Sequence, residues 1–167
     1  MSDIVNRVAQ SSLVTFDLEE FYPPGERKSI DLKDWLYEGL ILKEKEFRAE
    51  VTTHDWTQYR DTYVALYCST DAIIPAWAYM LITTRLQPYV KQVSVGSPET
   101  LESTLYQAEL EKITFEDYKD KPVIIKGCSH KPVPPNAYIW ALLKLQPHAR
   151  SIQYGEACSS VPLYKRK

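Results

Sequence analysis

Short apolar runs alternate with helical patterns along the second half of the chain, and this alternation constrains the fold more than any other feature. The apolar runs are typical of strands and occupy residues 62–68, 91–96, 121–128 and 151–155. The helical patterns between them occupy residues 71–89, 97–113 and 134–150. Strands separated by helices predict βαβ units, and therefore a mostly parallel sheet with right-handed crossovers.

Residues 1–60 are less regular. The segment 12–22 suits one strand, and the stretch FYPPGERKS after it predicts a loop. A helix is predicted over residues 31–50, where apolar side chains spread around much of the circumference. Because no internal repeat and no linker is apparent, we predict a single α/β domain over residues 1–167. Its expected form is a three-layer αβα sandwich with a mostly parallel, Rossmann-like sheet, plus an N-terminal strand and helix.

Charge and hydropathy exclude several classes of protein. The 167 residues carry a formal net charge of −2, so no broad nucleic-acid footprint is expected. The most apolar run, residues 72–82, is too short to span a bilayer. No export signal is visible at the N-terminus, and the three cysteines are widely spaced. We therefore expect a cytoplasmic protein with reduced thiols, bound to neither membrane nor nucleic acid.

The cysteines follow the predicted strands. Cys68 and Cys128 end two of these runs, and Cys158 comes shortly after a third. The carboxyl ends of parallel strands share one edge of a sheet, where ligands bind at the point of reversed strand order. Cys68 and Cys128 would flank that point if the strands lie in the order 91–96, 62–68, 121–128 and 151–155.

The sharpest hypothesis for this edge is a metal site. Thiolate and imidazole groups bind zinc or iron, and Cys128 and Cys158 are the expected ligands. His54 is the preferred histidine, and Asp71 is a further candidate ligand. Two alternatives stay open. Cys128 could be a reactive thiolate with His54 or His130 as its base, or the cysteines could be structural, in a non-catalytic binding or interaction domain.

Self-association is also expected. The wide apolar circumference of helix 31–50 and the twelve tyrosines suit an interaction surface. We predict a homodimer on this basis. The chemistry of a small-molecule ligand is not identified by any motif, because no glycine-rich phosphate-binding loop occurs.

Several stretches together resemble a small uncharacterised family, a domain of unknown function of Bacteroidetes. The stretches that carry the resemblance are DLKDWLYEGLILKEKEFR, HDWTQY, ALYCSTDAIIPAWAYML, VIIKGC and VPLYKRK. The resemblance covers nearly the whole chain and implies a bacterial, cytoplasmic protein. It implies no activity, cofactor or catalytic residue.

Overall fold

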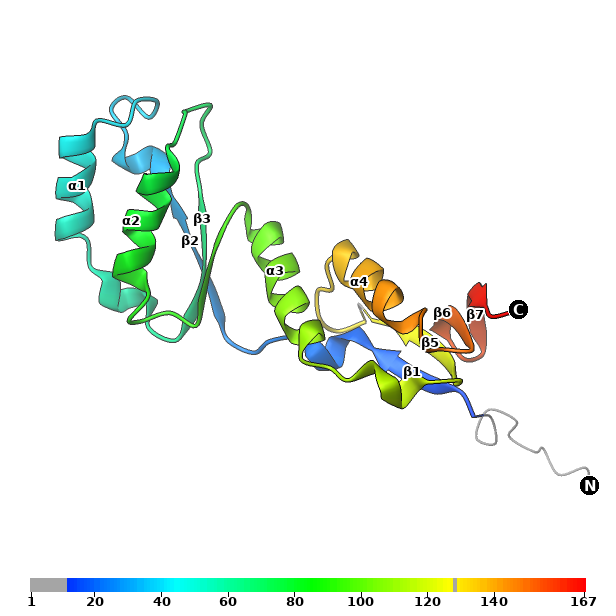
Figure 1. The fold of residues 1–167 in the computed structure, drawn as a ribbon. Coiled ribbons are helices and arrows are strands. Elements are labelled where there is room, and N and C mark those ends of the chain that lie inside the picture. Colours follow the sequence, from blue (N-terminus) through cyan, green and yellow to red (C-terminus); the bar gives the residue numbers. More distant parts are fainter. Residues whose placement is uncertain (1–11, 128) are drawn as a thin grey trace, which may run out of the picture. The chain divides into compact units, whose positions relative to one another are not determined.

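The chain divides into two compact units in a computed structural model that describes residues 12–127 and 129–167. Unit 1 comprises residues 1–23 and 105–167, and unit 2 comprises residues 24–104. Unit 2 is therefore a segment inserted between two parts of unit 1. Each unit has its own sheet and its own apolar core (Figure 1).

Unit 2 is built on a parallel sheet. Its strands are β2 (Glu26–Asp31), β3 (Thr62–Tyr67) and β4 (Gln92–Val95), in the order β2-β3-β4. The helices α1 (Glu44–Thr53) and α2 (Ala76–Leu86) pack beside this sheet (Figure 1). Their buried residues include Phe47, Val51 and Ile82, which form one core with the strand residues Ile30 and Leu66.

Unit 1 has a mixed sheet in the order β1-β5-β6-β7. The strands are β1 (Val14–Asp17), β5 (Pro122–Lys126), β6 (Ser151–Glu156) and β7 (Ser159–Lys165). The first three are parallel, and β7 pairs antiparallel with β6. Helix α4 (Pro135–Leu145) and the end of α3 (Pro98–Glu111) supply further core residues. The described part of the chain also contains four short 3-10 helices: Leu18–Phe21, Leu32–Trp35, Trp56–Tyr59 and Phe115–Tyr118.

The two units repeat one pattern. Residues 46–97 align with residues 105–156 without a gap, and both stretches run helix, 3-10 helix, strand, helix, strand. Asp61 and Asp120 occupy equivalent turns, and both have φ 58°. Asp61 donates its backbone N–H to the carbonyl of Tyr89 (2.9 Å), and Asp120 donates to the carbonyl of His148 (3.0 Å). The same turn, with the same backbone hydrogen bond, therefore occurs once in each unit.

The first strands extend this repeat. Asp17 ends β1 and Asp31 ends β2, and each caps a 3-10 helix. Their side chains accept hydrogen bonds from the N–H two residues later, at 3.0 Å and 3.1 Å respectively. The leucines that follow, Leu18 and Leu32, are fully buried. The expectation of a chain without an internal repeat is therefore wrong. The shared features are turn geometry and apolar positions, with few identical residues.

Mixed helix and strand content with mainly parallel pairing is confirmed. The predicted strand order is wrong, because β3 pairs with β2 and β4, whereas β5 pairs with β1 and β6. Cys68 and Cys128 consequently do not follow neighbouring strands of one sheet.

Three local predictions are also wrong. No helix covers residues 31–50, because Glu38 (φ 50°) and Gly39 (φ 71°) form a tight turn and α1 begins only at Glu44. The stretch predicted as a loop contains most of β2, a charged strand at the edge of its sheet. No strand was predicted after residues 151–155, whereas β7 lies there. Among the described residues, no helix has the length and apolar character needed to cross a membrane.

Candidate functional site

The predicted metal ligands fall in different parts of the molecule. Cys158 is exposed in the turn between β6 and β7 of unit 1. His54 and Asp71 belong to unit 2, where His54 precedes β3 and Asp71 follows it. These two residues therefore lie toward opposite ends of one strand. Cys128 lies outside the described residues.

His54 is surrounded by aromatic side chains. Its Nε2 lies 2.9 Å from the hydroxyl of Tyr59, and its ring makes edge contacts with Trp35 and Trp56 at centroid distances of 5.0 Å and 4.6 Å. Burial lowers the pKa of His54, although the charges of nearby carboxylates act in the opposite direction. These contacts place His54 in an aromatic cluster of the unit 2 core.

Asp71 borders an open cavity of about 650 Å³ in unit 2. The exposed side chains of Leu40, Ile41 and Ile73 also line it, together with Glu44. Within residues 12–127 and 129–167, no group of three or more histidine, cysteine, aspartate or glutamate side chains could hold a metal ion. Because Cys128 is a proposed ligand outside these ranges, the zinc or iron site stays a prediction.

The loops that follow β3 and β5 bind carboxylates from their own unit. Glu19 Oε1 accepts hydrogen bonds from the backbone N–H groups of Ser129, His130 (2.5 Å) and Lys131 (3.1 Å). The N–H of His130 lowers the pKa of Glu19 most, followed by that of Lys131.

In unit 2, Asp31 accepts hydrogen bonds from the N–H groups of Ser69 (3.0 Å) and Lys33 (3.1 Å). Burial acts to raise the pKa of Asp31, but the hydrogen bonds from Ser69 and Lys33 outweigh it and the pKa is lowered. The thiol of Cys68 lies 3.3 Å from the hydroxyl of Thr70 and packs against the unit 2 core. The amides at these strand ends are thus occupied by side chains of the same unit.

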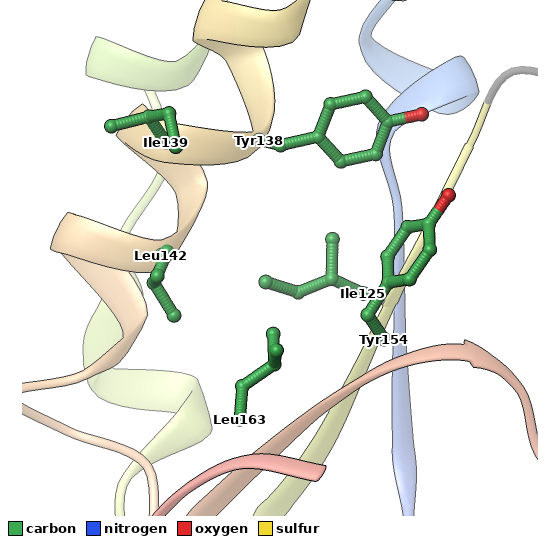
Figure 2. A pocket seen from close by; sticks show the side chains of 6 residues that line it. All are labelled: Ile125, Tyr138, Ile139, Leu142, Tyr154 and Leu163. Carbon is green, nitrogen blue, oxygen red and sulfur yellow. The ribbon is translucent and has the colours of Figure 1, made fainter. Parts of the chain in front are cut away.

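The strongest candidate site is an apolar groove on unit 1. It encloses about 490 Å³ between α4 and the strands β5, β6 and β7 (Figure 2). We call this feature the unit 1 groove. Its lining residues are Ile125, Tyr138, Ile139, Leu142, Tyr154 and Leu163.

Helix α4 and strand β7 together create the groove. Ala137, Ala141 and Leu145 are fully buried on the core side of α4. Tyr138 and Leu142 follow them around the helix and turn toward the strands (Figure 2). Because β7 pairs with β6, it places the side chain of Leu163 opposite this part of α4.

Two tyrosines form one side of the unit 1 groove. The rings of Tyr138 and Tyr154 meet in a T-shaped contact with centroids 5.8 Å apart, and their hydroxyl groups point away from the centre of the groove (Figure 2). A Cβ atom at Gly127 would lie 3.2 Å from the Tyr138 hydroxyl oxygen, tighter than most real contacts. A glycine at the end of β5 therefore lets this hydroxyl pack closely against the strand.

Sequence reasoning did not find the unit 1 groove. The available signals were apolar residues on α4 beyond those needed for its core face, and the apolar pair Val161 and Leu163 after β6. The two signals belong to one site only when β7 is known to fold back onto β6.

The comparisons with known proteins give a family without a described activity. The chain matches a family model over residues 2–166, and that family is described as "Protein of unknown function (DUF2480)". The chain belongs to this family. No curated protein and no solved structure matches it.

Proposed function

We propose that this protein is a non-catalytic binding protein whose unit 1 groove receives a small ligand with an apolar body and one polar end. The observation that carries the proposal is the lining of the groove, in which four aliphatic side chains and two tyrosines surround about 490 Å³. This volume is in the range of small-molecule pockets, which are mostly apolar with a few polar groups.

Solvent exposure of the lining supports this function. Ile139, Tyr154 and Leu163 are 54%, 42% and 50% exposed, although they are large apolar residues that line the same groove. A ligand that covers them gains roughly 25 cal/mol for each Å² of apolar surface removed from water. The exposed Tyr154 provides a hydroxyl that can form a hydrogen bond to a polar group at the rim of the groove.

The chemistry of the lining favours binding over catalysis. Apart from the two tyrosines, none of the six lining residues is of a type that enzymes use as acid, base or nucleophile. The amides after β5, which could otherwise stabilise a developing negative charge, already bind the carboxylate of Glu19.

Decanoate tests the proposal, because it combines an aliphatic chain with one carboxylate. We expect saturable binding by isothermal titration calorimetry and displacement of the fluorescent probe anilinonaphthalene sulfonate. Ile139→Asp should weaken decanoate binding at least about tenfold, which corresponds to about 1.4 kcal/mol. Leu143→Asp is the matched control, because Leu143 is 63% exposed on the same helix and does not line the groove.

Equal effects of the two substitutions would contradict the proposal, as would non-saturable binding by the wild-type protein. The folded state of each variant is checked by circular dichroism, so that loss of binding is separated from loss of structure.

Three predictions from the sequence, on localisation, oligomeric state and layer arrangement, form part of this proposal. We propose a bacterial, cytoplasmic protein that forms a homodimer, and a three-layer, Rossmann-like arrangement within one domain. The prediction of a homodimer loses one of its two original bases, because residues 31–50 are not one helix, and keeps the other, the twelve tyrosines. Exposed apolar side chains elsewhere in the molecule supply another basis for it.

A further inference from the structure

The last parallel strands of the two units differ in what flanks them. In unit 1, β6 lies between β5 and β7. The equivalent strand of unit 2 is β4, which pairs only with β3 among the described residues. The register is the same in both units, since Val95 is opposite Leu66 and Tyr154 is opposite Ile125. Unit 2 therefore has an open strand edge where unit 1 has an antiparallel partner.

Apolar residues beside this edge are exposed. Val95 is 53% exposed and Met80 is 67% exposed. Their equivalents in unit 1, Tyr154 and Ile139, line the groove that Leu163 of β7 completes. In unit 2 no described strand takes the place of β7, so Val95 and Met80 have no neighbouring strand on that side.

We propose that β4 pairs antiparallel with β4 of a second copy of this chain, about a twofold axis through Ser94. This pairing joins the two unit 2 sheets into one continuous sheet across the dimer. It goes beyond the groove proposal, because it concerns another unit and names the surface of the predicted homodimer.

The direction of the backbone groups fits this register. Gly96 donates its N–H to the carbonyl of Leu66 in β3 at 2.8 Å. Backbone groups alternate along a strand, so those of Ser94 also face β3, whereas those of Val93 and Val95 face the open edge. Val93 of one copy and Val95 of the other would then exchange both backbone hydrogen bonds, as an antiparallel hydrogen-bonded pair does.

Unit 1 shows the same alternation. Pro162 of β7 is opposite Gln153, the residue equivalent to Ser94. Proline has no N–H, so it suits a position that makes no hydrogen bond to the neighbouring strand. The homologous edge of unit 1 thus already accepts an antiparallel strand in the proposed pattern.

The side chains agree with the twofold axis. Residues opposite each other in an antiparallel pair point to the same face of the sheet. The twofold axis that relates the two β4 strands can therefore pass through a residue, which then lies opposite its own copy. It cannot pass between two residues, because neighbours along a strand point to opposite faces. A centre on Ser94 sets a small side chain against its own copy. It also places Val93 against Val95 of the partner subunit on the face shared with Leu66. The exposed Val95 is thereby covered.

Disulfide trapping tests the register directly. The two Ser94 residues would form a non-hydrogen-bonded pair with Cα atoms about 4.5 Å apart, within the range of disulfides. Ser94→Cys should therefore give a covalent dimer under mild oxidation. Gln92→Cys is the matched control on the same strand, because residue 92 would lie opposite Gly96 of the partner subunit and far from its own copy.

Sedimentation velocity measures the dimer without cross-linking. Val95→Lys should raise the dimer dissociation constant at least about tenfold, because it places two like charges beside the apolar pairs. Val95→Pro should act in the same direction by removing one outward N–H, while its pairing with β3 is kept. Val161→Lys is the control, since Val161 is equally exposed on a strand of unit 1.

A wild-type protein that stays monomeric at about 100 μM would overturn the proposal. So would a dimer that persists unchanged in Val95→Lys, or an equal yield of cross-linked dimer from Ser94→Cys and Gln92→Cys. Decanoate binding is measured on each variant, and we expect it to be unchanged in Val95→Lys. A failure of the edge pairing is therefore distinguishable from a failure of the groove proposal.

Discussion

The separate cores of units 1 and 2 are built on equivalent positions, whereas the surfaces of the two units differ. Equivalent residues are buried in both, such as Phe47 and Tyr106, or Val51 and Leu110, each of them at most 1% exposed. After the last parallel strand, however, the chain of unit 1 turns back as β7, whereas the chain of unit 2 continues into α3. The comparison teaches that repeated core and turn positions produce the fold, while one added strand produces the groove.

The two units also differ in which carboxylate binds the backbone N–H groups of the strand-to-helix loop. Unit 2 uses Asp31, which caps a 3-10 helix and accepts the N–H of Ser69. Unit 1 uses Glu19 for the loop, while its equivalent aspartate, Asp17, lies 3.7 Å from Lys126. In both units a carboxylate accepts hydrogen bonds from the loop amides, but the carboxylate comes from different positions in the two units.

The largest expected effect comes from a matched pair of core substitutions. Leu86 and Leu145 occupy the same position of α2 and α4, and both are fully buried. Leu86→Ala and Leu145→Ala should each lower the free energy of unfolding by about 2–5 kcal/mol, because each leaves a cavity. Urea denaturation followed by circular dichroism measures the change.

The exposed Leu143 provides the control, since Leu143→Ala should change the free energy of unfolding by no more than about 0.5 kcal/mol. The tryptophans of unit 2 add a local probe in a Trp140→Phe background, because Trp140 is in unit 1. A loss below about 1 kcal/mol in only one unit would break the energetic equivalence.

A smaller effect is expected where the units use different residues at one position. His54 of unit 2 is equivalent to Ile113 of unit 1, which packs against its core. Because burial lowers the pKa of His54, the folded state binds fewer protons than the unfolded state. Wild-type stability should therefore fall as pH decreases from about 6.5, the unfolded value, toward the lowered folded pKa.

His54→Ile should remove this part of the pH dependence. At pH 7.5 it should cost about 1 kcal/mol or less, since it loses the hydrogen bond to Tyr59 but gains apolar packing. Urea denaturation at several pH values between 5 and 7.5 measures both effects. His54→Gln, which keeps a hydrogen-bonding side chain without the titration, is the control. An unchanged pH profile in His54→Ile would mean that another group causes it.

The smallest expected effect is local to the loop after β5. The lowered pKa of Glu19 means that its contacts with the loop are present above the unfolded glutamate pKa and are lost as pH falls through the folded value. The amide resonances of His130 and Lys131 should follow this titration in NMR spectra, with a midpoint below about 4.3. Glu19→Gln should abolish it.

Asp31→Asn provides the matching change in unit 2 and should alter the Ser69 amide but not those of His130 and Lys131. A titration midpoint at or above that of free glutamate would contradict the role given to Glu19.

For the second half of the chain, the sequence predicted the bounds of strands and helices better than it predicted which strands pair. The helix predicted over residues 97–113 is α3, and its start at Pro98 follows from Ser97 and Pro98. Strands β3, β5 and β6 were also predicted near their observed bounds. These elements depend on local apolar periodicity and helix-start residues, which one stretch of sequence contains completely.

The candidate site was not predicted. Of the proposed ligands, His54 lies in an aromatic cluster and Asp71 follows the opposite end of β3. The unit 1 groove depends on residues as distant in sequence as Ile125 and Leu163. Their contact requires the pairing of β7 with β6, which no local pattern specifies.

The sequence by itself determined a mixed fold of parallel strands and packed helices, because alternating apolar runs and helix caps act over short distances. The tertiary structure alone decided that these strands form two sheets and that the units repeat one pattern. It also decided that, among the parallel strands of residues 12–127 and 129–167, β6 alone has an antiparallel neighbour. The physical reason is that every strand presents the same backbone donors and acceptors at its edges. Its side chains determine which face is buried, but packing of the whole unit determines which strand lies beside it.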